Sequence, residues 1–225
     1  MQYHRLFLFI LLGLVLSLSA CIDEDFSTSP QHTVYLSTDT VSFDTIFSTI
    51  GSTTKQVMVY NRNKVNLRIT EIKLCGANDS PFRLNVDGRT TPNNRFTDVE
   101  IRANDSLYVF VEVTVDPTNN NMPVLIRDSV QLQVNGNIKK LQLQAYGQDV
   151  IIFKNKTIVN DTLLTNTKPY LIFGSLVVDT MKTLEIEAGS TLYFHDKGKL
   201  KVKGNLKAKG TLLQPIVFRG DRFGI

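Results

Sequence analysis

Few residues of this chain carry side chains that commonly act as nucleophiles, general bases or metal ligands. Among its 225 residues there are two cysteines and three histidines: Cys21, Cys75, His4, His32 and His195. The histidines lie in three separate segments, so their spacing offers no Ser/His/Asp or Cys/His set and no metal-ligand pattern. His195-Asp196 is typical of a turn, and residues 198–204 lack the Gly-Lys-Ser/Thr ending of a phosphate-binding loop. We therefore expect no catalytic residue, no cofactor and no metal within these residues, and no enzymatic activity.

The thiol of Cys21 is the group best placed for covalent chemistry because of what precedes it. Residues 6–18 form a nearly unbroken apolar run after a short basic start. The run is too short to span a bilayer and is about right for the apolar part of a signal peptide. Ser19 and Ala20 then supply small residues before a cleavage point. An ordinary signal peptide cut after Ala20, with a chance cysteine following, is the alternative interpretation.

The stretch Leu18-Ser19-Ala20-Cys21 resembles the lipobox of bacterial lipoproteins. The resemblance implies that residues 1–20 are a leader that is removed, and that Cys21 is acylated on its sulfur and its new amine with fatty chains such as palmitate. Sulfur suits this capture because the thiolate is a good nucleophile. More than one chain makes attachment stable, since each buried methylene contributes roughly 0.8 kcal/mol. We expect the mature protein to be bound to a membrane.

Residues 21–32 have the composition of a tether. Asp23, Glu24 and Asp25 follow the cysteine, and a Ser/Thr/Pro-rich linker comes after them. Repulsion between these carboxylates keeps the tether extended and solvated. They also resemble the export signal of bacteroidete surface lipoproteins, which implies an outer-membrane location with display at the cell surface. A periplasm-facing location is the alternative.

The composition favours an all-β globular protein. Hydrophobic residues make up 42% of the chain, Trp is absent, and Thr, Val, Ile and Leu recur in short runs. Once Cys21 is acylated, Cys75 has no cysteine left for an internal disulfide. Its surroundings, Ile72-Lys73-Leu74-Cys75-Gly76, predict a buried thiol at the end of a strand.

Residues 33–150 alternate apolar and polar side chains with the period of two that is typical of strands. The inward positions predicted in this way are Val57, Val59, Leu67, Ile69, Val109, Val111, Val113, Val115, Val130, Leu132, Val134, Leu141, Leu143 and Ala145. Asn135-Gly136 predicts a tight hairpin, because both residue types accept a positive φ. About eight strands separated by polar turns predict a β-sandwich.

The order of these segments resembles the immunoglobulin-like domain of the ASH and major-sperm-protein type. The segments that carry the resemblance are Val41 to Ile46, the turn Gly51-Ser52-Thr53-Thr54, Lys55 to Asn61, Leu67 to Thr70, Cys75-Gly76-Ala77-Asn78, Phe82, and Ser106 to Val115 followed by Asp116-Pro117-Thr118. Such a domain implies spacing and contact with proteins, with no chemistry of its own.

Residues 151–225 show a second pattern of very short strands punctuated by glycine. Examples are Leu184 to Gly189, Leu192 to Phe194, Leu200 to Gly204, Leu206 to Gly210 and Ile216 to Gly220. Short strands with two or three inward residues are typical of a chain that winds around a prism. Thr183 to Gly220 resembles the first coils of a right-handed parallel β-helix, as in bacterial surface proteins and polysaccharide lyases. A second sandwich or a barrel is the alternative.

The number of coils raises a difficulty for this part of the chain. About two coils are visible, whereas repeat architectures generally need about three or more units to bury a continuous core. No polar cap appears before Ile225. Because an uncapped coil exposes apolar surface and strand edges, we expect a longer chain or completion by a partner.

Positive charge is concentrated in the second part. By count, residues 21–150 hold 12 Lys+Arg against 15 Asp+Glu, and residues 151–225 hold 12 against 6. The outward positions of the predicted coils include Lys199, Lys201, Lys203, Lys207 and Lys209. They predict either a solvated face that discourages edge pairing or a strip that binds an anionic glycan. We expect no nucleic-acid partner, because aromatic side chains do not interleave with the lysines and the expected location is wrong for it.

A recurrent Asp-Ser/Thr-aliphatic triplet is similar to the O-glycosylation sequon of bacteroidete extracytoplasmic proteins. The resemblance would place glycans on Thr40, Thr45, Ser106, Ser129, Thr162 and Thr180. The alternative is structural, since Asp-Ser/Thr is a natural turn before a strand.

Together these features predict a non-enzymatic surface lipoprotein in four parts. These are a signal peptide (1–20), an acylated tether (21–32), an immunoglobulin-like spacer (33–150) and the initial coils of a parallel β-helix (151–225) for adhesion or contact with a glycan or protein. The alternative is an N-terminal fragment of a β-helix polysaccharide lyase or glycoside hydrolase whose catalytic coils are missing.

Overall fold

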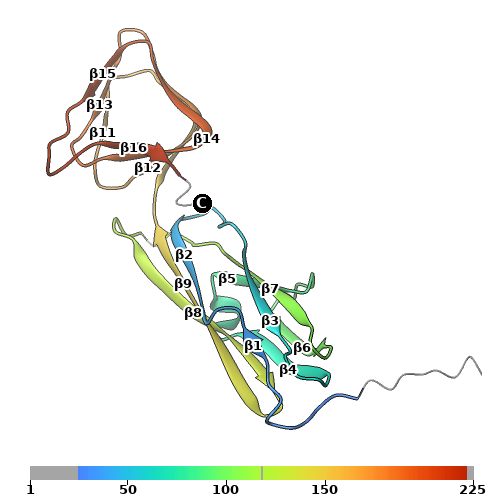
Figure 1. The fold of residues 1–225 in the computed structure, drawn as a ribbon. Helices are drawn as coiled ribbons and strands as arrows, with labels where there is room; N and C mark the ends of the chain where they lie inside the picture. The colour runs from blue at the N-terminus through green and yellow to red at the C-terminus, as the bar shows by residue number, and fades with distance from the viewer. Residues whose placement is uncertain (1–24, 118, 222–225) are drawn as a thin grey trace, which may run out of the picture.

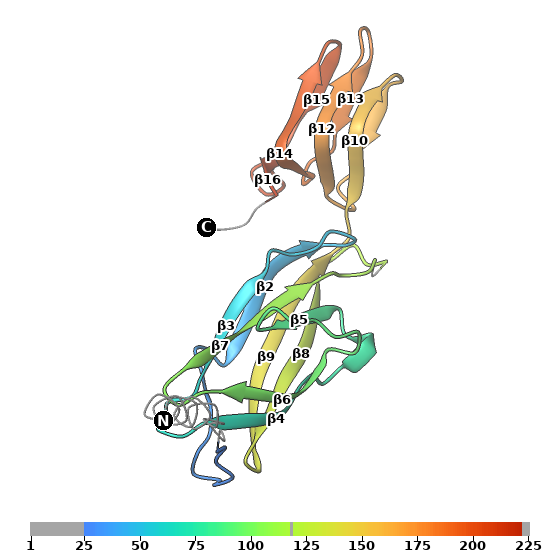
Figure 2. The ribbon, with the colours of Figure 1, turned by 90° about the vertical axis from the view of Figure 1, so that its right-hand side faces the viewer.

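The computed structural model describes residues 25–117 and 119–221 and contains two bodies built almost wholly of strands. A sandwich of β1 to β9 comes first, and a coil of parallel strands, β10 to β16, follows it. Figures 1 and 2 show the second body next to one end of the first, joined where β9 runs into β10. Within the described ranges there is no helix that is long and apolar enough to cross a membrane.

One sheet of the sandwich has the strand order β1-β3-β7-β5. Its strands are β1 (Tyr35–Leu36), β3 (Lys55–Tyr60), β7 (Ser106–Val113) and β5 (Phe82–Val86). All neighbours in this sheet are antiparallel. The pleat therefore places alternate side chains on the inner face, which β7 shows most clearly because its every second residue is buried.

The other sheet has the order β2-β9-β8-β4-β6. Its strands are β2 (Thr40–Phe47), β9 (Asn137–Gln148), β8 (Val124–Val134), β4 (Leu67–Leu74) and β6 (Arg95–Ile101), with the short helix η1 (Ala77–Asp79) between β4 and β5. The pair β2 and β9 is parallel and the remaining pairs are antiparallel.

The core of the sandwich confirms the inward positions that the sequence predicts, since all fourteen are buried in one cluster. The hairpin prediction is also confirmed: Val134 pairs with Asn137, and Asn135 and Gly136 between them have φ of 48° and 79°. The prediction for Cys75 was right about the strand end and wrong about burial, because the thiol is exposed. Leu74 points into the core, so the alternation turns the next side chain outward.

The second body is a parallel β-solenoid of about three turns. One sheet has the order β10-β12-β14-β16, formed by Ile151–Ile158, Tyr170–Val178, Thr191–Val202 and Val217–Gly220. The other has the order β11-β13-β15, formed by Thr162–Leu164, Thr183–Ile186 and Asn205–Ala208. Figure 1 looks along the coil and shows a roughly triangular outline.

The solenoid has one coil more than the sequence predicts. Residues 151 to 169 already form a coil, whose strand β10 pairs with β12 from Ile151 opposite Tyr170 onward. This coil was missed because its strand bends at a register shift near Asn155, which has a φ of 45° and interrupts the alternation. Stacking of three coils buries a separate core that includes Ile172, Leu176 and Leu184.

Candidate functional site

The third coil carries the five lysines that the sequence singles out. Lys199 and Lys201 lie in β14, Lys207 lies in β15, and Lys203 and Lys209 directly follow these two strands. All five are exposed. They do not form one flat strip, because β14 and β15 belong to different sheets. The lysines therefore lie on both sides of the corner where the third coil passes from one sheet to the other.

The coil beneath the lysines has a different charge. In the strand register, Lys199 lies opposite Ser175 and Lys201 opposite Val177. Lys207 lies opposite Glu185, and Lys209 continues that register opposite Glu187. In these registers the second coil therefore offers only neutral or acidic neighbours to the lysines of the third coil.

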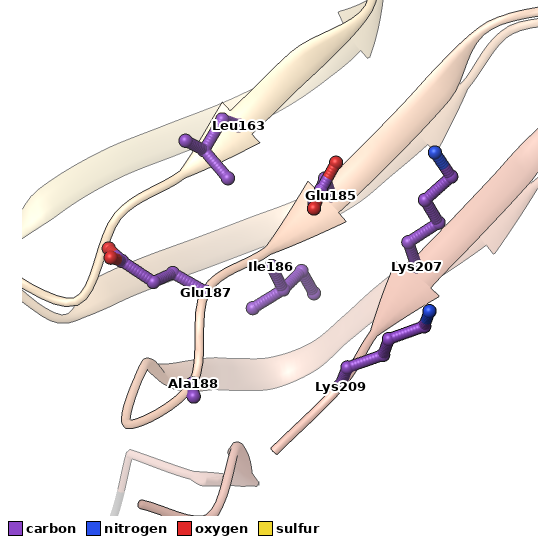
Figure 3. Close-up of a pocket in the computed structure, with 7 residues that line it drawn as sticks. All are labelled: Leu163, Glu185, Ile186, Glu187, Ala188, Lys207 and Lys209. Carbon is purple, nitrogen blue, oxygen red and sulfur yellow. The ribbon is translucent and has the colours of Figure 1, made fainter.

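A shallow groove of about 290 Å³ lies on the outer face of β11-β13-β15. It is lined by Leu163, Glu185, Ile186, Glu187, Ala188, Lys207 and Lys209. Figure 3 shows Glu185 on the middle strand between Leu163 and Lys207, as the register requires. The groove offers an exposed apolar side chain, two carboxylates and two ammonium groups. Local sequence patterns do not reveal this groove, because its lining comes from three successive coils.

One of these carboxylates holds the groove wall in place. A Glu187 carboxylate oxygen accepts the backbone N–H of Asn166 at 2.9 Å, and the Asn166 side-chain amide donates to the Ala188 carbonyl at 2.9 Å. Glu187 therefore links the loop that follows β11 to the loop that follows β13. Within the described ranges, neither Lys207 nor Lys209 lies within 4 Å of a carboxylate. Their ammonium groups can meet an anionic ligand without breaking an ion pair.

His195 pairs with Asp221, which lies 26 residues later in the sequence. Its Nδ1 lies 2.5 Å from Oδ2 of Asp221, and its ring centroid lies 4.5 Å from that of Phe173. Asp196, its neighbour in sequence, is exposed and has a φ of 47°. No group of three His, Cys, Asp or Glu side chains in the part of the chain that the structure describes is arranged to hold a metal ion.

A second charged cluster lies on the sandwich. The Glu71 carboxylate is buried and contacts Lys73 Nζ and Arg95 Nε, each at 2.6 Å. The hydrogen bond from Lys73 and the charge of Arg95 hold the pKa of Glu71 below its usual value, against the effect of burial. Lys73 and Arg95 also line a groove of about 330 Å³ beside η1. The single carboxylate offsets part of the charge of these two cations, so this groove is less positive than the third coil.

The Asp-Ser/Thr triplets fall in different structural settings. Thr40, Ser106 and Thr162 begin strands, and Thr180 lies between β12 and β13. In contrast, Thr45 lies within β2 and Ser129 within β8, so the interpretation as a turn before a strand is wrong for these two.

The aspartates of several triplets have a structural role. The carboxylates of Asp105, Asp128 and Asp179 accept the backbone N–H of the next residue at 2.6 to 2.8 Å. Among the six hydroxyl-bearing residues, Thr40 and Thr180 are exposed. Cys21, the predicted lipidation residue, lies outside the described residues.

Comparison with known proteins gives likenesses in fold only. No family model and no curated protein matches this sequence. A PapD-like ASH domain of human CEP192 matches with a TM-score of 0.33 and 13% identity over 59% of this chain and 94% of that domain. The Escherichia coli chaperone DraB matches with 0.32 and 12% over 52% of this chain and 55% of its own.

An enzyme is also among the similar structures. A family 123 glycoside hydrolase from Clostridium perfringens, described for glycolipid glycan hydrolysis, matches with a TM-score of 0.34 and 7% identity. The match covers 51% of this chain and 25% of the hydrolase, so this chain spans a quarter of that enzyme's length. Likenesses at this level carry no inference about activity. The fold class, an immunoglobulin-like sandwich followed by a parallel β-solenoid, stands on the strand order and registers.

Proposed function

We propose that this chain is a non-enzymatic, lipid-anchored lipoprotein of the outer membrane that displays a β-solenoid at the cell surface. In this proposal Cys21 and the tether hold the protein at the bilayer, and the sandwich acts as a spacer. The third coil of the solenoid then meets an anionic glycan, such as an acidic polysaccharide or the phosphorylated part of a lipopolysaccharide. The function is adhesion.

The single observation that carries this proposal is the concentration of five exposed lysines on one coil. Within the described ranges they lie more than 4 Å from any carboxylate. An array of free ammonium groups raises the local concentration of a polyanion and binds it with a strength that falls as salt screens the charges. The corner between β14 and β15 also lets a flexible chain contact two faces at once.

The groove adds a means of selecting the ligand. Lys207 and Lys209 line it together with the exposed side chain of Leu163. A sugar chain presents apolar C–H faces as well as charged groups, so a site with both kinds of contact fits it better than a site with charge alone. Glu185, opposite Lys207, disfavours carboxylates or phosphates placed deeper in the groove.

The test is binding of polygalacturonate, with its fully methyl-esterified form as the uncharged ligand. The triple variant Lys201→Gln, Lys203→Gln, Lys207→Gln is expected to weaken binding at least about tenfold at low salt, with a smaller salt dependence than the parent protein. The matched control, Lys55→Gln, Lys64→Gln, Lys140→Gln, removes three exposed lysines from the sandwich and should bind like the parent. Equal losses in both triple variants would show that net charge alone attracts the glycan and would contradict a site on the third coil.

A further inference from the structure

The groove beside η1 is a second concave site, and it lies on the sandwich. Its volume of about 330 Å³ is at the small end of the range for ligand sites. The residues that line it come from β4, η1, the turn before β6 and the first residue of β6: Lys73, Leu74, Ala77, Asn78, Asn93 and Arg95. The charged side chains among them are both cations. The groove therefore suits an anionic ligand.

The two cations of this groove are placed where they repel each other. Lys73 and Arg95 lie directly opposite each other in the antiparallel pair of β4 and β6. Like charges in such positions are destabilising. Glu71 offsets part of the repulsion with one carboxylate oxygen for each cation, since Oε1 lies 2.6 Å from Arg95 Nε and Oε2 lies 2.6 Å from Lys73 Nζ. Two cations against one carboxylate leave the cluster with a net charge of +1.

The contact with Glu71 leaves most hydrogen-bond donors of both cations available to a ligand. The Glu71 side chain is 11% exposed, whereas those of Lys73 and Arg95 are 37% and 57% exposed, so the cations cover the carboxylate. Arg95 uses its Nε in this contact, and within the described ranges its Nη groups donate to no other residue. These Nη groups form a planar fork that fits a carboxylate. Lys73 keeps further N–H donors on the same ammonium group.

Two asparagines beside the cations offer contacts for the uncharged part of a ligand. Asn93 Oδ1 accepts the backbone N–H of Arg95 at 3.3 Å, so the amino group of the Asn93 side chain is left to donate to a ligand. Asn78 and Ala77, both in η1, supply an exposed amide and an exposed methyl group. Amides donate and accept, as hydroxyl groups do, and a methyl group can pack against the C–H surface of a sugar ring. The lining therefore fits a hydroxylated anion better than a bare one.

We propose that the groove beside η1 binds the carboxylate of a single acidic sugar residue, such as a uronic acid. The Nη groups of Arg95 and the ammonium group of Lys73 hold the carboxylate, and Asn78 and Asn93 hold ring hydroxyls. One carboxylate neutralises the net charge of the cluster. The proposal goes beyond adhesion by the third coil, because it gives the sandwich a binding site of its own and does not involve the lysines of the solenoid.

The test uses methyl glucuronide as the probe, with methyl glucoside as the neutral sugar and acetate as the carboxylate without a sugar. In a titration followed by NMR, we expect methyl glucuronide to shift the backbone amide signals of Ala77 and Asn78 and the Nε–H signal of Arg95, with a roughly millimolar dissociation constant. Methyl glucoside and acetate should each bind at least about tenfold more weakly. Equal binding of either control, or no shift of these signals at roughly 50 mM methyl glucuronide, would overturn the proposal.

Variants in the same pair of strands locate the site. Arg95→Gln should weaken binding of methyl glucuronide at least about tenfold, and Arg95→Lys, which keeps the charge and loses the planar fork, should weaken it by a smaller factor. Arg68→Gln is the matched control, because Arg68 of β4 pairs with Glu100 of β6 at 2.9 Å and does not line the groove. Unchanged thermal unfolding is the check on folding.

The same probe keeps this proposal separate from that for the third coil. The triple lysine variant that weakens binding of polygalacturonate should bind methyl glucuronide as the parent protein does, so that either proposal can fail alone. Equal losses in Arg95→Gln and Arg68→Gln would show that the groove is not the site and would overturn the proposal, leaving the solenoid as the place where a glycan binds.

Discussion

The ring of Phe47, the last residue of β2 in the sandwich, lies 4.8 Å from the ring of Tyr193 in β14 of the solenoid, at an interplanar angle of 49°. Tyr193 shares its register column with Leu171, which is fully buried although it lies outside the core cluster of the solenoid. Lys168 and the buried Asp149 add an ion pair at 3.4 Å where the two bodies join. The two bodies therefore share an apolar contact as well as a covalent connection.

The aromatic pair should couple the two bodies energetically. In a double-mutant cycle of Phe47→Ala and Tyr193→Ala, we expect a coupling energy of about 1 kcal/mol, the usual size for a tilted aromatic pair. Either single variant should also widen the distribution of relative orientations, measured by small-angle scattering. Tyr108 and Phe110 stack at 5.9 Å within one strand of the sandwich, so Tyr108→Ala and Phe110→Ala are the matched control. Unchanged scattering in Phe47→Ala would mean that the connection alone orients the bodies.

The contact should also weaken at alkaline pH. Burial raises the pKa of Tyr193 above its usual value of 10.0, and the nearby Arg219 guanidinium opposes this in part. Because the folded state favours the neutral phenol, this contribution to stability is complete below pH 10 and is lost as the pH rises through the higher folded pKa. Absorbance titration should show a tyrosine that ionises late, and Tyr193→Phe should remove that step. If the late step persists in Tyr193→Phe, another tyrosine accounts for it.

Close approach of successive coils makes one glycine sensitive to substitution. A Cβ at Gly204 would overlap the carbonyl oxygens of Asp179 and Lys182 in the preceding coil, whereas a Cβ at Gly220 would meet nothing within 4 Å. Backbone atoms cannot rotate away, so Gly204→Ala should lower the free energy of unfolding of the solenoid by about 1–3 kcal/mol. Gly220→Ala should be close to neutral. Urea unfolding of both variants gives the comparison, and equal stability would show that the coils can separate at this corner without cost.

Local sequence patterns were sufficient to predict the sandwich. They were not sufficient to predict the features of the solenoid that are formed by residues from successive coils. Period-two runs such as Val109, Val111 and Val113 identify strands because each strand faces one shared core. The pair His195 and Asp221 could not be found in this way, since one complete coil separates the two residues in sequence. The column Leu163, Glu185 and Lys207 did leave a signal, a repeated spacing of 22 residues (185 − 163 and 207 − 185). That spacing was hidden because the side chains at these outward positions share no chemical type.

The lipid anchor gives the last prediction, and it concerns a residue outside the described ranges. If Cys21 carries the acyl chains, a palmitate analogue supplied to growing cells should label the parent protein, and Cys21→Ser should remove the label and release the protein from the membrane fraction. Attachment by several acyl chains should be stable, since each buried methylene contributes roughly 0.8 kcal/mol. Cys75→Ser is the matched control, because this exposed thiol is the other cysteine of the chain and should leave labelling unchanged. Equal labelling of the parent protein and Cys21→Ser would contradict the anchor, and the solenoid would then have to reach its ligand from solution.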